Sequence, residues 1–143
     1  MSSEILKPVV VLAAWSMLMW VVMYAKRLPA MKRAGMLDTA LIGSVGADIR
    51  AKLSGRDQWP ADNYNHLMEQ PTIFYAVALA LALMGSGNTL NATLAWVYVG
   101  FRIVHSLAQV SVNHVPTRFA LHALGTVPLM MLCAHAVVIV FSR

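Results

Sequence analysis

Four long, mostly apolar segments divide the chain, and their length is the feature that most constrains its fold. They run from about Ile5 to Ala25, Ala61 to Met84, Leu90 to Val112 and Thr117 to Phe141. A helix needs about 20 apolar residues to cross the hydrocarbon core of a bilayer. Charged residues make up 12% of the chain, against about 25% in a typical soluble domain. We therefore expect an all-α integral membrane protein, a four-helix bundle formed by one domain over residues 1–143.

The second segment differs from the others because its strictly apolar part, Pro71 to Met84, is shorter than a span requires. Its helix must begin earlier, in the polar run NYNHLMEQ, and must hold those side chains at or near membrane depth. Pro71, like Pro128 in the last segment, cannot donate a backbone hydrogen bond, so a kink is expected at each.

Lysine and arginine are distributed unevenly around the four segments. Seven lie in the long connection after the first segment, and Arg118 makes eight on that side, whereas Lys7 and Arg143 lie on the other. The positive-inside rule places the loop from Lys26 to Pro60 in the cytoplasm and both termini outside, in a cell inner membrane. The net charge of +5 is therefore a topology signal. Since no nucleic-acid-binding module is recognisable, we expect no nucleic-acid partner.

The middle of the long loop reads LDTALIGSVGADIRAKLSG and alternates apolar and polar residues loosely. Such a segment could lie along the membrane surface as an interfacial helix, although Gly43 and Gly46 interrupt the pattern. The single cysteine, Cys133, lies in an apolar run, and no cysteine–histidine cluster is present. We expect neither a disulfide within the chain nor a metal site.

Polar residues recur at helical spacing inside three of the segments. In the second segment Asn65, His66 and Glu69 are three and four residues apart, which places them on one side of a helix. Arg118 and His122 begin the last segment one turn apart. The third segment carries a single polar stripe, formed by Tyr98, Arg102, His105 and Gln109.

Lipid cannot solvate these polar faces, so the three helices should turn them toward one another. A charge at membrane depth needs a partner, and Glu69 is the natural ion-pair partner of Arg102. This pattern alone leaves two roles open. A buried glutamate–arginine pair can be a fixed structural element, or it can belong to a functional seam near the cytoplasmic end of the helices.

Three runs carry a resemblance to a known family: DNYNHLMEQPTIFYAVALAL, YVGFRIVHSLAQ and RFALHALG. Together they resemble the MAPEG family, the membrane-associated proteins in eicosanoid and glutathione metabolism, and look most like its bacterial branch. The similarity covers the chain from about Asp62 to Gly125. It implies a homotrimer of four-helix bundles, with glutathione bound between subunits at the cytoplasmic side. Members of the family conjugate glutathione to lipophilic electrophiles, reduce lipid hydroperoxides or isomerise lipids, and some only bind a ligand.

The resemblance also implies roles for particular residues. Arg118 is similar to the arginine that activates the glutathione thiol, if a small insertion is allowed. The transferase branch has basic residues where this chain has Trp59 and Asp62, and an asparagine is usual at the position of His66. Tyrosines that flank glutathione in that branch are replaced here by histidine and glutamine. The implied ligand-binding residues are Asn65, His66, Glu69, Tyr98, Arg102, His105 and Gln109.

Two functions follow as expectations, and the resemblance leaves open whether the protein is an enzyme. The first is a glutathione-dependent transferase or peroxidase that acts on lipophilic small molecules at the cytoplasmic membrane edge. The second is a non-catalytic membrane protein that binds a lipid or a partner in the seam between subunits. A small transporter is disfavoured, because four segments without internal symmetry do not suggest an alternating-access design.

Overall fold

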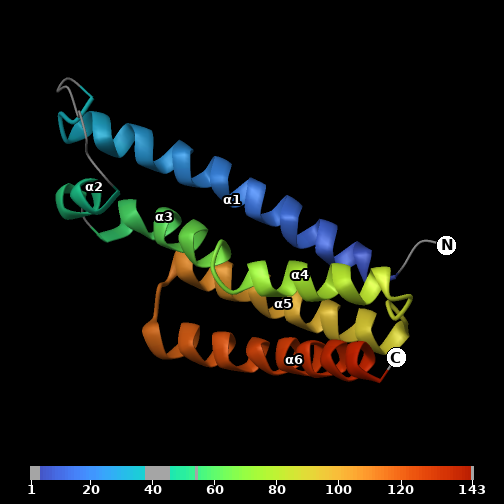
Figure 1. The fold of residues 1–143 in the computed structure, drawn as a ribbon. Coiled ribbons are helices and arrows are strands. Elements are labelled where there is room, and N and C mark those ends of the chain that lie inside the picture. Colours follow the sequence, from blue (N-terminus) through green and yellow to red (C-terminus); the bar gives the residue numbers. More distant parts are fainter. Residues whose placement is uncertain (1–3, 38–45, 54, 143) are drawn as a thin grey trace.

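The computed structural model describes residues 4–37, 46–53 and 55–142, and in this part of the chain all regular structure is helical. The helices are α1 (Leu6–Arg33), α2 (Gly46–Lys52), α3 (Gly55–Leu67), α4 (Pro71–Leu83), α5 (Thr89–Ser111) and α6 (Val115–Phe141). Figure 1 shows the long helices running roughly along one another, with α3 and α4 separated by a break and the short helix α2 at one end.

The first helix is longer than the sequence suggests. The expected span ends near Ala25, but α1 continues through the basic residues Lys26 and Arg27 and past Pro29 as far as Arg33. Gly35 follows with φ +64°, a left-handed conformation that glycine adopts without strain and that commonly ends a helix. The expected cytoplasmic loop therefore begins as a helix. Of its proposed interfacial part, residues 38–45 and 54 lie outside the described residues, and Gly46–Lys52 forms α2.

The helix expected from Ala61 to Met84 is two helices, α3 and α4. Pro71 is the first residue of α4, where its missing N–H costs no hydrogen bond. In front of it the chain makes tight turns, in which the Met68 N–H donates to the Asn65 carbonyl over 2.9 Å and Thr72 Oγ1 donates to the Glu69 carbonyl over 2.7 Å. The kink predicted at this proline is thus a break between Leu67 and Pro71. No break occurs at Pro128, which lies inside the continuous helix α6.

Three segments among the described residues are long and apolar enough to cross a membrane: Leu6–Arg33, Gly55–Leu83 and Val115–Phe141. The third expected span is present as the 23-residue helix α5, but it is not among them because it carries the polar stripe. Many large apolar side chains on the other helices are exposed, including Leu83, Phe119, Met130 and Val138. An apolar outer surface around a polar interior is what a lipid solvent requires.

The core lies where α5 packs against α1, α3 and α6. Phe74 of α4 and Tyr98 of α5 are fully buried, and their rings stack with centroids 4.7 Å apart. At Gly125 of α6 a Cβ would lie 3.0 Å from Cβ of Phe101, so this glycine lets α5 and α6 approach closely. The start of α1 and the end of α6 lie at one end of the molecule, and α2 lies at the opposite end with the connection between α5 and α6 (Figure 1).

Candidate functional site

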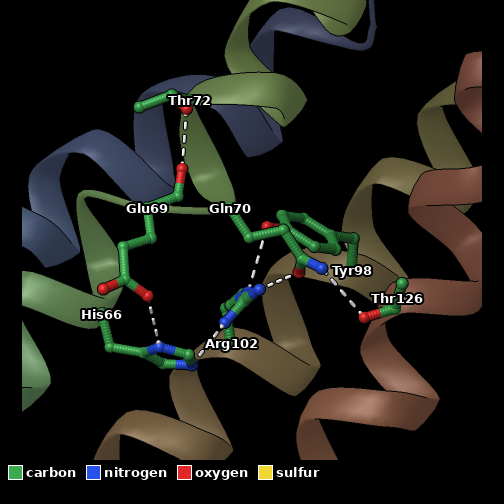
Figure 2. A network of polar contacts seen from close by, with 7 residues as sticks. All are labelled: His66, Glu69, Gln70, Thr72, Tyr98, Arg102 and Thr126. Atoms are coloured by element: carbon green, nitrogen blue, oxygen red, sulfur yellow. Dashed lines mark hydrogen bonds and ion pairs between the residues drawn. The ribbon is translucent and has the colours of Figure 1, made fainter.

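Arg102 is the centre of a buried polar network inside the helices. Its side chain is 3% exposed, and it has three partners in the same chain. Nε donates to the Tyr98 hydroxyl over 3.0 Å, Nη1 lies 3.2 Å from Nε2 of His66, and Nη2 donates to Oε1 of Gln70. The guanidinium carbon also lies 5.3 Å from the centroid of the Tyr98 ring. Figure 2 shows these groups converging on Arg102 from α3, α5 and the break before α4.

The direct ion pair expected between Glu69 and Arg102 is not formed within one chain. His66 stands between them, because its Nδ1 lies 3.2 Å from Oε2 of Glu69 while its Nε2 faces Arg102 (Figure 2). A guanidinium can only donate, so Nε2 accepts and Nδ1 carries the proton directed at the carboxylate. The imidazole therefore connects the two charges. The side chain of Glu69 is 69% exposed, which leaves its outer side available to another molecule.

Gln70 is the main member of this network that the sequence interpretation missed. Its amide oxygen accepts from Arg102, and its Nε2 donates to Thr126 Oγ1 of α6 over 3.0 Å. The side chain of Gln70 thus connects the break between α3 and α4 to both α5 and α6 through hydrogen bonds. A signal was present: Asn63, His66 and Gln70 are spaced by three and four residues, which defines one helical face. Asn63 confirms the assignment, since its Nδ2 donates to Ser106 Oγ of α5 over 2.7 Å.

The neighbouring face of the same segment lines a polar hollow of about 260 Å³. Asp62, Asn65 and Glu69 are again spaced by three and four residues, and they border the hollow together. Arg50 of α2 and Arg118 of α6 line the hollow as well. The full lining is Arg50, Asp62, Asn65, His66, Glu69, Gln109 and Arg118.

A second hollow of about 210 Å³ adjoins the first and has largely apolar walls, with Val115 and Phe119 of α6 among its lining residues. His66 and Arg118 border both hollows. The remaining lining residues are His105 and His122. The ring centroid of His66 is 4.7 Å from that of His105 and 5.1 Å from that of His122. Three helices thus bring one imidazole each to the place where the hollows meet.

Arg118 occupies the first turn of α6. Its Nη1 donates to Oδ1 of Asn113 over 2.6 Å, and Asn113 itself is held at φ +55° in the turn before the helix. Its Nε is buried and has no hydrogen-bond partner among the described residues. The positive end of the helix dipole lies at the same point. Because Arg118 lines both hollows, the charge of its guanidinium can stabilise a negative atom in either.

The structure divides the eight site residues expected from the sequence into two groups. Six border the hollows: Asn65, His66, Glu69, His105, Gln109 and Arg118. Tyr98 and Arg102 border neither of the two and are buried behind His66, where they hold the network together. The structure adds five residues to the lining: Arg50, Asp62, Val115, Phe119 and His122. Among the described residues, no group of three or more histidine, cysteine or acidic side chains is placed to hold a metal ion.

The comparison with protein families decides the assignment. The model of the MAPEG family matches residues 5–138, which is nearly the whole chain and includes every lining residue named above. The chain belongs to the MAPEG family. Neither the curated proteins nor the solved structures give a significant match. MAPEG proteins include glutathione transferases and peroxidases as well as non-catalytic members, and together with the candidate spans the match makes this chain a membrane protein.

Proposed function

We propose that this MAPEG protein is a glutathione-dependent transferase or peroxidase that acts on lipophilic electrophiles at the cytoplasmic edge of the inner membrane. The observation that carries the proposal is the pair of adjoining hollows, one lined by charged and amide groups and the other bordered by Val115 and Phe119. A water-soluble tripeptide suits the first, and an apolar compound that arrives from the lipid suits the second. Both hollows are bordered by Arg118, so the two reactants would meet at a guanidinium.

The test is binding followed by turnover. Glutathione at 100 times its Kd should stabilise the protein by about 2.7 kcal/mol, which a thermal melt in detergent detects as a rise in Tm. The same preparation is then assayed for conjugation of glutathione to a chloronitrobenzene and for reduction of a lipid hydroperoxide. Binding without turnover of either compound would favour the non-catalytic alternative. The absence of a shift at millimolar glutathione would overturn the proposal.

We further propose that the protein is a homotrimer of four-helix bundles, with α5 as a fourth membrane span and the α3–α4 segment lining the centre. One chain alone exposes the Glu69 carboxylate on a membrane-capable segment, and an unsatisfied polar group in lipid costs several kcal/mol. A second and third copy would cover this polar surface. The mass of the protein measured in mild detergent should therefore equal three chains. A mass of one chain under conditions that preserve the fold would exclude the trimer.

The orientation proposed for the chain has both termini outside and the α1–α3 connection in the cytoplasm. The start of α1 and the end of α6 lie at one end of the molecule, and α2, which carries Arg50 and Lys52, lies at the other (Figure 1). A reporter enzyme that works only in the cytoplasm should be inactive when fused after Arg143 and active when inserted near α2. The reverse pattern would show that the chain is inserted the other way round.

A further inference from the structure

A third hollow, of about 240 Å³, adjoins the polar hollow and is lined in part by α2. It is lined by Arg27, Gly46, Ala47, Arg50, Gln58, Asp62 and Asn65. Three of these residues, Arg50, Asp62 and Asn65, also border the polar hollow. The ion pair between Arg50 and Asp62 therefore borders both polar hollows.

This ion pair is loosely made. Nη2 of Arg50 lies 3.5 Å from Oδ2 of Asp62, and the arginine side chain is 66% exposed. Asp62 is the only hydrogen-bond partner of Arg50 among the described residues. A guanidinium has five N–H donors in a fixed fork, so most of its donor capacity remains for a ligand. The pair between Arg33 and Asp57 is of the same type, at 3.3 Å, but it borders none of the hollows described here.

The formal charges of the acidic residues and arginines around the polar hollow cancel, since Asp62 and Glu69 face Arg50 and Arg118. A simple anion gains little from such a lining, because each guanidinium is accompanied by a carboxylate. A zwitterion gains from both signs. The α-amino-acid group combines a carboxylate and an ammonium on adjacent atoms, and an arginine–aspartate pair offers the complementary two charges.

We infer that Arg50 and Asp62 bind the α-amino-acid end of the soluble ligand, with its carboxylate on Arg50 and its ammonium on Asp62. The inference rests on the proposed function and extends it, since the γ-glutamyl end of glutathione is such a group. Because Arg50 and Arg118 border the same hollow, a tripeptide anchored at the pair can extend its thiol toward Arg118. The pair is a specificity determinant, because it selects ligands that carry both charges at one end.

The experiment measures Kd by calorimetry for three probes: glutathione, γ-glutamyl-alanyl-glycine, which lacks the thiol, and N-acetylglutathione, which lacks the ammonium. Arg50→Gln and Asp62→Asn should each weaken binding of the first two probes about tenfold, the value of one charge-assisted hydrogen bond. The matched controls Arg33→Gln and Asp57→Asn should change Kd by less than about twofold, because they remove only an exposed ion pair. N-Acetylation should weaken binding to the wild type about tenfold and should cost nothing further in Asp62→Asn.

The results distinguish a failure of the docking site at Arg50 and Asp62 from a failure of the proposed transferase function. If both peptides bind and the Arg50 and Asp62 variants behave like the controls, the docking site is wrong and the transferase proposal stands. If the thiol-free peptide binds and depends on both residues while no electrophile is turned over, the docking site stands and the transferase proposal fails. If the wild type binds neither peptide, both are overturned.

Discussion

Arg102→Ala should lower the free energy of unfolding by about 3–5 kcal/mol, because it leaves several buried polar groups unsatisfied at about 1–3 kcal/mol each. The substitution would leave His66 Nε2, Gln70 Oε1 and the Tyr98 hydroxyl without their partner, in a region where water does not replace it. Reversible unfolding in mixed detergent micelles measures the change. The control is Arg33→Ala, which removes an arginine with 65% exposed side chain and should cost less than about 1 kcal/mol. Equal effects at the two arginines would show that the network contributes nothing.

A double-mutant cycle tests how Glu69 is connected to Arg102. Since His66 separates them, the coupling between Glu69→Gln and Arg102→Ala should be below about 0.5 kcal/mol, as for residues that share no direct contact. Gln70→Ala and Arg102→Ala remove the two ends of one hydrogen bond, so their coupling should exceed about 1 kcal/mol. A large coupling for the first pair would mean that Glu69 reaches Arg102 directly, as it could if the carboxylate came from another subunit.

The second large effect is expected at Arg118, on the reactivity of bound glutathione. A thiol with a pKa near 8.5 is about 3% thiolate at pH 7, and stabilisation of the anion by about 2.7 kcal/mol would lower that pKa by two units. Arg118 can provide this through the charge of its guanidinium, which borders both hollows, together with the N-terminus of α6. In Arg118→Ala the pKa of the bound thiol should return toward 8.5, as measured from the ultraviolet absorbance of the thiolate during a pH titration.

The effect on rate has a calculable range and a definite pH dependence. At pH 7 the thiolate fraction in Arg118→Ala should be roughly 25-fold lower than in the wild type. The thiolate in the variant is more basic and therefore more nucleophilic, by about eightfold, which offsets part of this loss. Conjugation by Arg118→Ala should therefore be about 3-fold to 25-fold slower at pH 7. Above about pH 9.5 the bound thiol should be ionised in both proteins, so the difference in thiolate fraction between Arg118→Ala and the wild type should disappear. Arg118→Lys keeps the charge and should recover part of the rate. A variant with wild-type thiol pKa and rate would show that Arg118 only marks the membrane boundary.

Several features were predictable from the sequence because they depend on local periodicity. The apolar runs predicted helices that the structure confirms as α1, α4, α5 and α6. The spacing of Tyr98, Arg102, His105 and Gln109 predicted one polar face on α5, and all four side chains are buried. Family membership could also be predicted from the sequence, because each motif is an unbroken run of residues.

The tertiary structure decided which polar groups meet. Arg102 contacts His66 and Gln70 and does not contact Glu69 within the chain, because residues 63, 66 and 70 form the face that packs on α5 while residues 62, 65 and 69 face the polar hollow. Spacing alone could not separate two faces so close together, and Glu69 and Gln70 lie in the break between α3 and α4, where helical spacing no longer applies. It also could not bring Arg50 of α2 to Asp62, or α6 to α3, since those contacts join segments distant in sequence. Helical periodicity fixes the direction of a side chain relative to its own helix axis, and only the packing of the helices against one another determines what it touches.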